Sequence, residues 1–288
     1  MGTSCILQFF ANSREHADMA AALAVAEIER IQEKYSRYAP TSILSAINRA
    51  AGEGKSVLVD EETAELLEFA FACYRKSGGL FDITAGVLRR AWNFSSGQLP
   101  SDNELRVLLP LIGMDKLIWR SPHLTFSLSG MEMDFGGIGK EYAVDRVATL
   151  LVSEGIEHGL INLGGDLFAL GPQADDQPWK IGLRDPHHAG VLVEEVDLCH
   201  GALATSGDYE RCLEIRGQRY CHILNPHTGW PVHGLSSVTV LAPQCMVAGS
   251  LATIAMLKEG NGIAWLAERE LPHRWIDSAG NQGGDLLR

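Results

Sequence analysis

Apolar residues return at helical spacing in four parts of the chain. From Ser13 to about Tyr35 they recur every three or four positions, which predicts an amphipathic helix. A second helix is predicted from Asp60, a good N-cap residue, to the Gly78-Gly79 pair, a good C-cap. The same spacing predicts helices over about 138–153 and about 246–258, the second of which would be the last helix of the chain.

Short alternating or apolar segments predict strands between and after these helices. Residues 116–134 alternate weakly, as paired strands would. Further short strands are predicted at 159–162, 167–170, 180–183, 191–198 and 236–241. Helices and strands mix without regular strand–helix–strand alternation, which predicts an α+β fold with mixed, largely antiparallel sheets and packed helices. We expect one domain over residues 1–288, which could comprise two lobes, because no clear linker interrupts the chain.

A hairpin is predicted within residues 202–229. The Gly217-Gln218 pair is the expected two-residue turn, and it would set Leu213 opposite His222. Side chains alternate faces along a strand, so His222 would share the inward face of Leu213 at the strand end, beside the rigid loop 225–229. From these residues alone, His222 fits either a buried core histidine or a functional residue.

Composition and charge narrow the class of protein. The chain has 288 residues, 46% of them hydrophobic and 21% charged, as is usual for a soluble globular protein. Its formal net charge of −12 argues against sequence-independent binding to nucleic acid or anionic membranes. No stretch approaches the roughly 18 apolar residues of a membrane span, and no secretory signal is visible, so we expect a cytoplasmic protein unless a leader is missing. Six scattered cysteines without a Cys-x-x-Cys spacing favour free thiols over disulfides and give no zinc-ligand pattern.

The segment 133–140 is a candidate anion-binding cradle. It is expected to join a strand end to a helix start, where exposed N–H groups, glycines and Lys140 could hold a phosphate. It is not a Walker A loop, because Asp134 stands where that pattern needs glycine and Glu141 where it needs Ser or Thr. The alternative is a tight turn that needs glycine for packing.

Two further segments are weaker signals. Residues 161–166 form a strand followed by a Gly-Gly turn, which alone predicts a hairpin or bulge. Thr253 lies in the predicted last helix, where a lone threonine usually bonds back to a carbonyl of the preceding turn.

Taken together and in order, eight segments resemble the FAD:protein FMN transferase family, the ApbE-type flavin transferases. The matching segments are Met1-Gly2-Thr3, SRYAPTSILSAIN (36–48), GGLFDIT (78–84), DFGGIGKEYAVD (134–145), INLGGD (161–166), ATSGDYER (204–211), HILNPHTGWP (222–231) and LAT (251–253). Each is weak alone, but together they cover nearly the whole chain in collinear order.

The resemblance implies an FAD-binding α+β fold and a Mg²⁺-dependent reaction in which a threonine of a target protein receives FMN from FAD and AMP is released. It implies a catalytic role for His222. The residues that it places at FAD are Met1, Tyr38, Leu80, Phe81, Asp82, Asp134, Lys140 and Ile223. It implies that Mg²⁺ is held by the carbonyls of Gly137 and Ala252 and by the hydroxyl of Thr253.

Three positions depart from the family pattern. Gly249 stands where the family usually has an aspartate, four residues before Thr253, and Asn225 replaces a second usual aspartate. Glu141 replaces a common glycine and adds negative charge near the cradle. Because two carboxylates near the expected metal are lost, we expect weaker Mg²⁺ affinity and expect Gly249→Asp to raise activity. Asn225 can still cap its turn, so the loop should keep its shape.

Two other functions compete with the transferase. One is an FAD-binding family member with weakened or lost metal-dependent catalysis, which Gly249 and Asn225 favour. The other is a relic of the fold that acts only through protein contacts. The presence of Tyr38, Asp134 and His222 favours the two flavin hypotheses over the relic.

Overall fold

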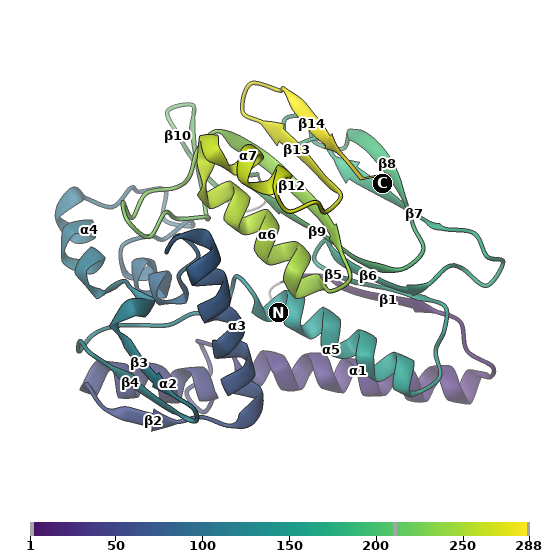
Figure 1. Ribbon diagram of the computed structural model, residues 1–288, viewed down its shortest axis with the longest axis horizontal. Helices are drawn as coiled ribbons and strands as arrows, with labels where there is room; N and C mark the ends of the chain where they lie inside the picture. The colour runs from purple at the N-terminus through teal and green to yellow at the C-terminus, as the bar shows by residue number, and fades with distance from the viewer. Residues whose placement is uncertain (1–2, 210–211, 287–288) are drawn as a thin grey trace. The chain divides into compact units, whose positions relative to one another are not determined.

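The computed structural model describes residues 3–209 and 212–286 (Figure 1). The chain divides into two compact units. The first unit comprises Met1–Gln32, Ile138–Tyr209 and His233–Arg288, and the second comprises Glu33–Gly137 and Glu210–Val232. No helix in the described part of the chain is long and apolar enough to cross a membrane.

The first unit is built on a seven-stranded sheet whose neighbouring strands are antiparallel. In sheet order the strands are β1 (Cys5–Phe9), β5 (Gly159–Leu163), β6 (Asp166–Gly171), β9 (Gly201–Gly207), β12 (Leu235–Ala242), β13 (His273–Asp277) and β14 (Gln282–Asp285). The turn from β5 to β6 is Gly164-Gly165, with φ of 64° and 94°, so the segment 161–166 is the hairpin that the sequence predicts.

The two faces of this sheet are covered differently. A second sheet, β7 (Trp179–Arg184) with β8 (Leu192–Leu198), shares one apolar core with Leu160, Leu167 and Leu203 of the main sheet. The alternate residues, such as Asp166 and Ser206, therefore point to the other face. There α5 (Gly139–Ser153) packs on β5 and β6, and α6 (Cys245–Leu257) packs on β9 and β12.

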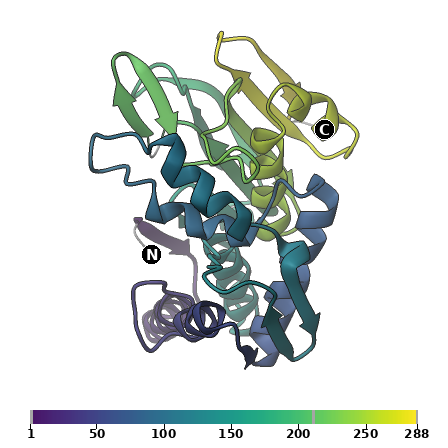
Figure 2. The same ribbon diagram turned by 90° about the vertical axis from the view of Figure 1, so that its left-hand side faces the viewer.

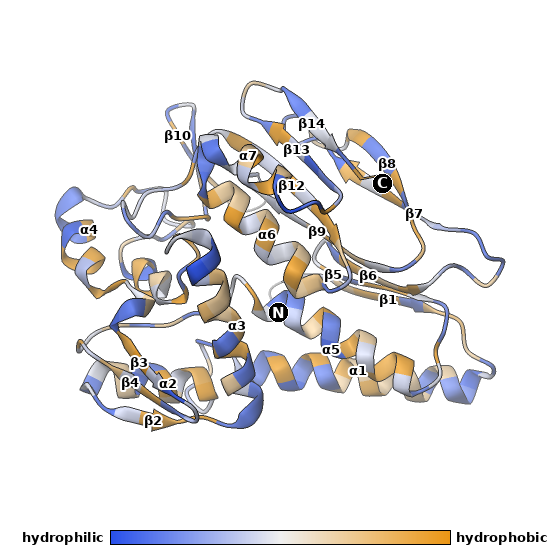
Figure 3. Ribbon diagram, viewed as in Figure 1, coloured by the Kyte–Doolittle hydropathy of each residue, from blue (hydrophilic) through white to orange (hydrophobic). Residues whose placement is uncertain are grey.

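The helices of the first unit differ in how far they are buried. α5 and α6 also pack on each other, as Figure 1 shows. α6 is apolar nearly all round and buried, whereas α1 (Arg14–Lys34) alternates apolar and polar colours in Figure 3 and buries one stripe. α1 is seen nearly end-on, in purple, in the turned view of Figure 2. η4 (Glu259–Asn261) and α7 (Gly262–Ala267) follow α6, so the helix predicted near 246–258 exists but is not the last one.

The second unit is richer in helices. It contains α2 (Ile43–Glu53), α3 (Glu61–Ser77), the 3₁₀ helix η1 (Ile83–Arg90), α4 (Asp102–Leu108), η2 (Leu109–Leu111) and η3 (Met114–Lys116). A small antiparallel sheet has the strand order β2 (Ser56–Leu58), β4 (His123–Phe126), β3 (Leu117–Arg120). α3 has the predicted ends: the Asp60 side chain accepts from Thr63 N, and Gly78 ends the helix with φ of 73°.

The hairpin near residue 217 exists, but its predicted register is wrong. β10 (Cys212–Ile215) pairs with β11 (Gln218–Cys221) so that Leu213 faces Tyr220. The turn is Arg216-Gly217, and both residues have positive φ, 53° and 77°, as a type I′ turn requires. This turn could not be predicted from the sequence, because arginine rarely takes positive φ. The observed partner of Leu213 lies two residues before the predicted one. Side chains in a strand alternate with a period of two, so the paired residues still share the predicted face.

The strands predicted within 116–134 end earlier than expected. β3 and β4 form the pair, but no strand is present over residues 127–135, which precede α5. The candidate cradle therefore does not follow a strand end. Its backbone is held by contacts described in the next subsection.

Candidate functional site

Three of the matching sequence segments meet in the second unit. Asn48 Nδ2 donates to the carbonyl of Met133 at 3.0 Å, and Met133 N donates to Asn48 Oδ1 at 2.8 Å. Asp134 N donates to the carbonyl of Ile83 at 2.8 Å. These bonds attach segments 36–48 and 78–84 to the start of segment 134–145. In a strand, this backbone would form hydrogen bonds with a neighbouring strand. Here the side-chain amide of Asn48 and the carbonyl of Ile83 are its partners instead.

Asp134 is the charged centre of this cluster. Its carboxylate forms an ion pair with Arg37, and its Oδ1 accepts from Gly136 N at 2.8 Å. The guanidinium of Arg37 lies 5.2 Å from the ring centroid of Tyr38. Tyr38 is 80% exposed, so a planar ligand can stack on the part of its ring that Arg37 does not cover.

The residues that were predicted to line the nucleotide, Leu80, Phe81 and Asp82, differ in burial and in their contacts. Phe81 is buried, whereas Gly137 is exposed. A Cβ on Gly137 would lie 3.4 Å from the Phe81 ring, so the ring packs directly against this glycine. Asp82 Oδ1 accepts from Thr84 N at 2.8 Å, and its Oδ2 accepts from a backbone N–H at 3.1 Å. Asp82 therefore shapes the start of η1, and burial raises the pKa of its carboxyl despite these bonds. Leu80 is half-buried.

A second group of matching residues meets within the first unit. Lys140 lies in the first turn of α5, and its Nζ is 2.7 Å from Oδ2 of Asp166, at the start of β6. On α6, the hydroxyl of Thr253 is 2.7 Å from the hydroxyl of Ser206 on β9. Thr253 thus has a side-chain partner across the helix–sheet interface. Ala252 beside it is fully buried.

Glu141 belongs to this group, although the sequence indicated it only as a departure. Its side chain is 7% exposed, and burial together with the charge of Asp166 raises the pKa of its carboxyl well above the ordinary range. Burial likewise raises the pKa of Asp166, although Lys140 opposes the change. The sequence signal that could have indicated a buried, functional Glu141 is its position next to Lys140, at the start of a helix whose following residues are largely apolar.

Oxygen donors in the first unit fit a hard divalent cation. Glu141 Oε2 is buried and has no hydrogen-bond partner among the described residues, and the Thr253 hydroxyl lies on the neighbouring helix α6. Mg²⁺ binds through such oxygens and usually takes one or two carboxylates. Across residues 3–209 and 212–286, no group of three or more His, Cys, Asp or Glu side chains is arranged to hold a metal. A cation here would therefore need hydroxyl, carbonyl, water or substrate oxygens as well.

The three residues predicted to bind the metal belong to different units. Gly137 is in the second unit, whereas Ala252 and Thr253 are in the first. Their joint role stays a prediction. Met1, predicted at FAD, lies outside the described residues.

The loop after the hairpin keeps the shape expected of it. Asn225 Oδ1 accepts from His227 N at 2.9 Å, and Asn225 N donates to the carbonyl of Trp230 at 2.8 Å. The indole of Trp92 donates to the carbonyl of Gly229 at 2.7 Å, and Gly229 has φ of 73°. Asparagine therefore closes this turn without the usual aspartate.

His222 is exposed, so the prediction that it points inward is wrong. β11 ends at Cys221, and the alternation of a strand no longer applies one residue later. Ile223, next along the chain, is buried with 9% exposure. Exposure removes the alternative of a buried core histidine.

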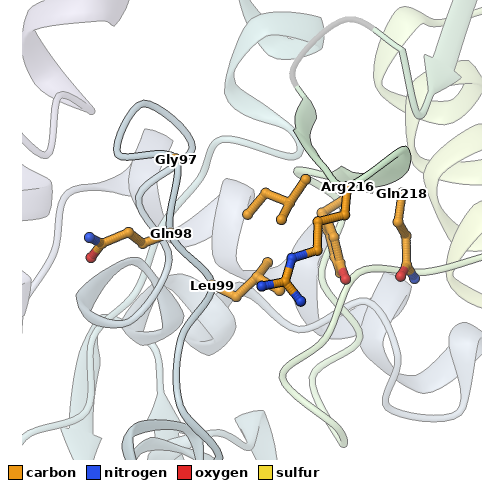
Figure 4. A pocket seen from close by; sticks show the side chains of 7 residues that line it. Gly97, Gln98, Leu99, Arg216 and Gln218 are labelled. Carbon is orange, nitrogen blue, oxygen red and sulfur yellow. The ribbon is translucent and has the colours of Figure 1, made fainter.

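A shallow hollow in the second unit was not foreseen from the sequence. It lies between Gly97–Leu99 and the hairpin, and Ile215, Arg216, Gln218 and Tyr220 complete its wall (Figure 4). None of these lining residues is among those that the family resemblance places at FAD or the metal.

Comparison with known proteins decides the family. The model of the ApbE family matches residues 1–275. The chain belongs to the ApbE family. It is 33% identical over 276 residues to the FAD:protein FMN transferase of Treponema pallidum, a match that covers 88% of this chain and 75% of the relative. It is 31% identical over 252 residues to the enzyme of that name from Vibrio cholerae, covering 85% of this chain and 75% of the relative.

Solved ApbE structures share the fold. The ApbE protein from Thermotoga maritima superposes with a TM-score of 0.90 at 29% identity, covering 99% of this chain and 94% of the other. The flavin transferase ApbE from Vibrio cholerae gives a TM-score of 0.88 at 27% identity, with the same coverage. The predicted α+β, ApbE-like fold is confirmed.

Proposed function

We propose that this ApbE-family chain is an FAD:protein FMN transferase, which moves FMN from FAD onto a threonine of a target protein and releases AMP. The observation that carries the proposal is the junction at Asp134, where three matching segments are joined by direct hydrogen bonds. Relatives with 31% and 33% identity that carry this enzyme name support it.

In the proposed reaction the hydroxyl oxygen of the target threonine attacks the phosphorus of the FMN half of FAD. A new P–O bond forms, the bond from that phosphorus to the bridging oxygen breaks, and AMP leaves with the bridging oxygen. The exposed His222 imidazole is the proposed acceptor of the hydroxyl proton. Phosphoryl transfer depends mainly on positioning and charge neutralisation, which backbone N–H groups at the start of α5 and Lys140 can assist.

The remaining residues hold the substrates. Tyr38 offers its exposed ring to the flavin, and the Arg37–Asp134 pair fixes the polar wall beside it. The proposed FAD contacts are Met1, Tyr38, Leu80, Phe81, Asp82, Asp134, Lys140 and Ile223. Mg²⁺, when bound, would neutralise pyrophosphate charge, and the proposed protein donors include the Gly137 and Ala252 carbonyls and the Thr253 hydroxyl.

The test is a transfer assay with the full chain. The protein is incubated with FAD, Mg²⁺ and an acceptor protein that carries a target threonine, and covalent flavin fluorescence is read on a denaturing gel while AMP is quantified. We expect equal amounts of bound flavin and AMP, and no product with an acceptor in which that threonine is alanine. An acceptor that stays unlabelled while the chain binds FAD would support the alternative, an FAD-binding member without catalysis.

His222→Ala tests the proposed proton acceptor. We expect the transfer rate to fall by about 100-fold or more, with FAD affinity little changed, because general base catalysis contributes on that scale. The matched control is His227→Ala in the same loop, whose exposed imidazole has no assigned role and whose backbone N–H makes the turn. Equal rates for His222→Ala and the unchanged protein would exclude the assigned role.

A further inference from the structure

The buried carboxyl of Glu141 lacks an adequate counter-charge. It lies against Asp166, and the positive group in contact with this carboxyl pair is Lys140, whose Nζ is 2.7 Å from Asp166 Oδ2. Two ionised carboxylates and one ammonium would leave an excess negative charge in a place that water hardly reaches, and burying such a charge is costly. Glu141 Oε2 also has no hydrogen-bond partner in the described part of the chain. The site therefore has a buried carboxyl oxygen without a hydrogen-bond partner among the described residues, where a bound cation can take the place of a proton.

The side chain of Glu141 fills the space beside Gly249 on α6. A Cβ placed on Gly249 would lie 2.6 Å from Glu141 Cγ and 2.9 Å from Glu141 Oε1. Atoms do not approach so closely without displacement, so a side chain at position 249 would have to push the Glu141 side chain out of its present place. Gly249 precedes Thr253 by four residues, about one helical turn, so both lie on the same face of α6. Glu141 thus brings a carboxylate from α5 to the face of α6 that carries Thr253.

The two departures from the family pattern at positions 141 and 249 therefore concern neighbouring residues that share one small volume. Gly249 stands where the family resemblance implies an aspartate, and Glu141, which stands where it implies a glycine, lies directly against Gly249. Glycine at both positions would leave this volume without a carboxylate, and side chains at both positions would clash. With Glu141 and Gly249, one carboxylate occupies it.

We propose that Glu141 is the carboxylate ligand of a divalent-cation site in the first unit, and that it acts with the Thr253 hydroxyl in place of an aspartate at position 249. The proposal rests on the proposed function in one respect, the choice of Mg²⁺ as the cation. It changes the sequence-based expectation for this chain: Gly249 does not deprive the site of charge, and Gly249→Asp alone adds a clash and a like charge.

The decisive measurement is cation affinity, read separately from transfer. Mg²⁺ is titrated calorimetrically into the full chain, with and without FAD, and Mn²⁺ is followed by electron paramagnetic resonance. Glu141→Gln keeps the shape and removes the charge, and we expect the dissociation constant to rise by about tenfold or more, since even outer-shell changes cost 10–100-fold. An unchanged dissociation constant for Glu141→Gln, or no cation binding by the unaltered chain, would overturn the proposal.

A swap of the two residues provides the positive test. Gly249→Asp alone should lower the melting temperature and bring no gain in affinity. Glu141→Gly combined with Gly249→Asp should bind within about threefold of the unaltered chain, whereas the matched pair Glu141→Gly with Gly249→Asn should not. If the paired variants do not fold, the Glu141→Gln titration decides the question by itself. Equal affinities of the Asp and Asn pairs would contradict the exchange.

The two proposals can fail separately. If Glu141→Gln loses cation affinity while the unaltered chain transfers no flavin, the cation site stands and the transferase function falls. If the unaltered chain transfers flavin and Glu141→Gln keeps the same Mg²⁺ dependence, the function stands and Glu141 is not the ligand.

Discussion

At the scale of single residues, Asn48 is the most informative side chain of the second unit. Its amide makes both hydrogen bonds to the backbone of Met133, a residue that is fully buried. Asn48→Ala would leave that N–H and carbonyl without these partners, and we expect a loss of about 2 kcal/mol in the free energy of unfolding. Urea denaturation followed by fluorescence measures it, and FAD affinity should fall in parallel because Asp134 follows Met133 directly.

The control for this prediction is the same chemical change at an exposed position. The Asn103 side chain accepts from Arg106 at 2.6 Å on the surface of α4, so Asn103→Ala should change stability by less than about 0.5 kcal/mol. A loss for Asn48→Ala as small as that of the control would show that Met133 finds other partners.

At the scale of elements, the N-terminus of α6 depends on a carboxylate from another helix. Gln244 supplies no side-chain cap, and Asp145 of α5 accepts from Cys245 N at 2.7 Å and Met246 N at 2.9 Å. An anion at this end also suits the helix dipole. Asp145→Ala should therefore lower the free energy of unfolding by about 2 kcal/mol, as a lost cap does at the upper end of its range. The helix that carries Gly249 and Thr253 would loosen at its start.

The same carboxylate gives a pH-dependent prediction. Burial raises the pKa of Asp145, and the two backbone hydrogen bonds only partly oppose it. A folded-state pKa above the unfolded value means that the folded protein binds more protons, so this contribution to stability is full at low pH and is lost as pH rises through the folded pKa. Relative to Asp145→Asn, the unaltered chain should thus lose stability as the pH rises above the ordinary carboxyl pKa of about 4.

Paired urea titrations of the two proteins at each pH measure this difference. Carboxyls common to both chains, such as Glu141 and Asp166, largely cancel in the comparison. A gap that widens in favour of the unaltered chain as pH rises would show that the hydrogen bonds, and not burial, dominate at Asp145.

At the scale of the whole molecule, ligand binding should be visible as stability. If the chain binds FAD, stabilisation follows the logarithm of ligand concentration and reaches about 2.7 kcal/mol at 100 times the dissociation constant. For a chain of this size that corresponds to a rise of about 5–10 °C in melting temperature. Differential scanning fluorimetry with FAD, and with NAD as the control that shares its adenosine diphosphate, measures the effect. Equal shifts with both would point to nucleotide binding without flavin recognition.

The net charge of −12 belongs to the same scale. It makes general attraction to phosphate groups unfavourable, so an anionic ligand depends on local donors such as Lys140 and the helix N-terminus. Binding of FAD should therefore be specific, and nonspecific nucleic acid should not compete for it.

Local rules explain what the sequence by itself determined. The ends of α3 at Asp60 and Gly78, the Gly164-Gly165 hairpin and the turn closed by Asn225 each depend on residues within a few positions of one another. The collinear motifs, likewise short, sufficed to identify the ApbE family, and the matching family model confirmed it. Such features could be predicted because the residues that define each cap or turn lie within a few positions of one another.

Only the tertiary structure decided which residues from distant segments share a space. The hydrogen bonds of Asn48 to Met133 and the contact of Glu141 with Gly249 join residues that are 85 and 108 positions apart. The exposure of His222 depends on where a strand ends. In the sequence, Glu141 and Gly249 are two unrelated departures, one adding and one removing a side chain. Packing of α5 on α6 makes them neighbours, because two side chains cannot fill one volume.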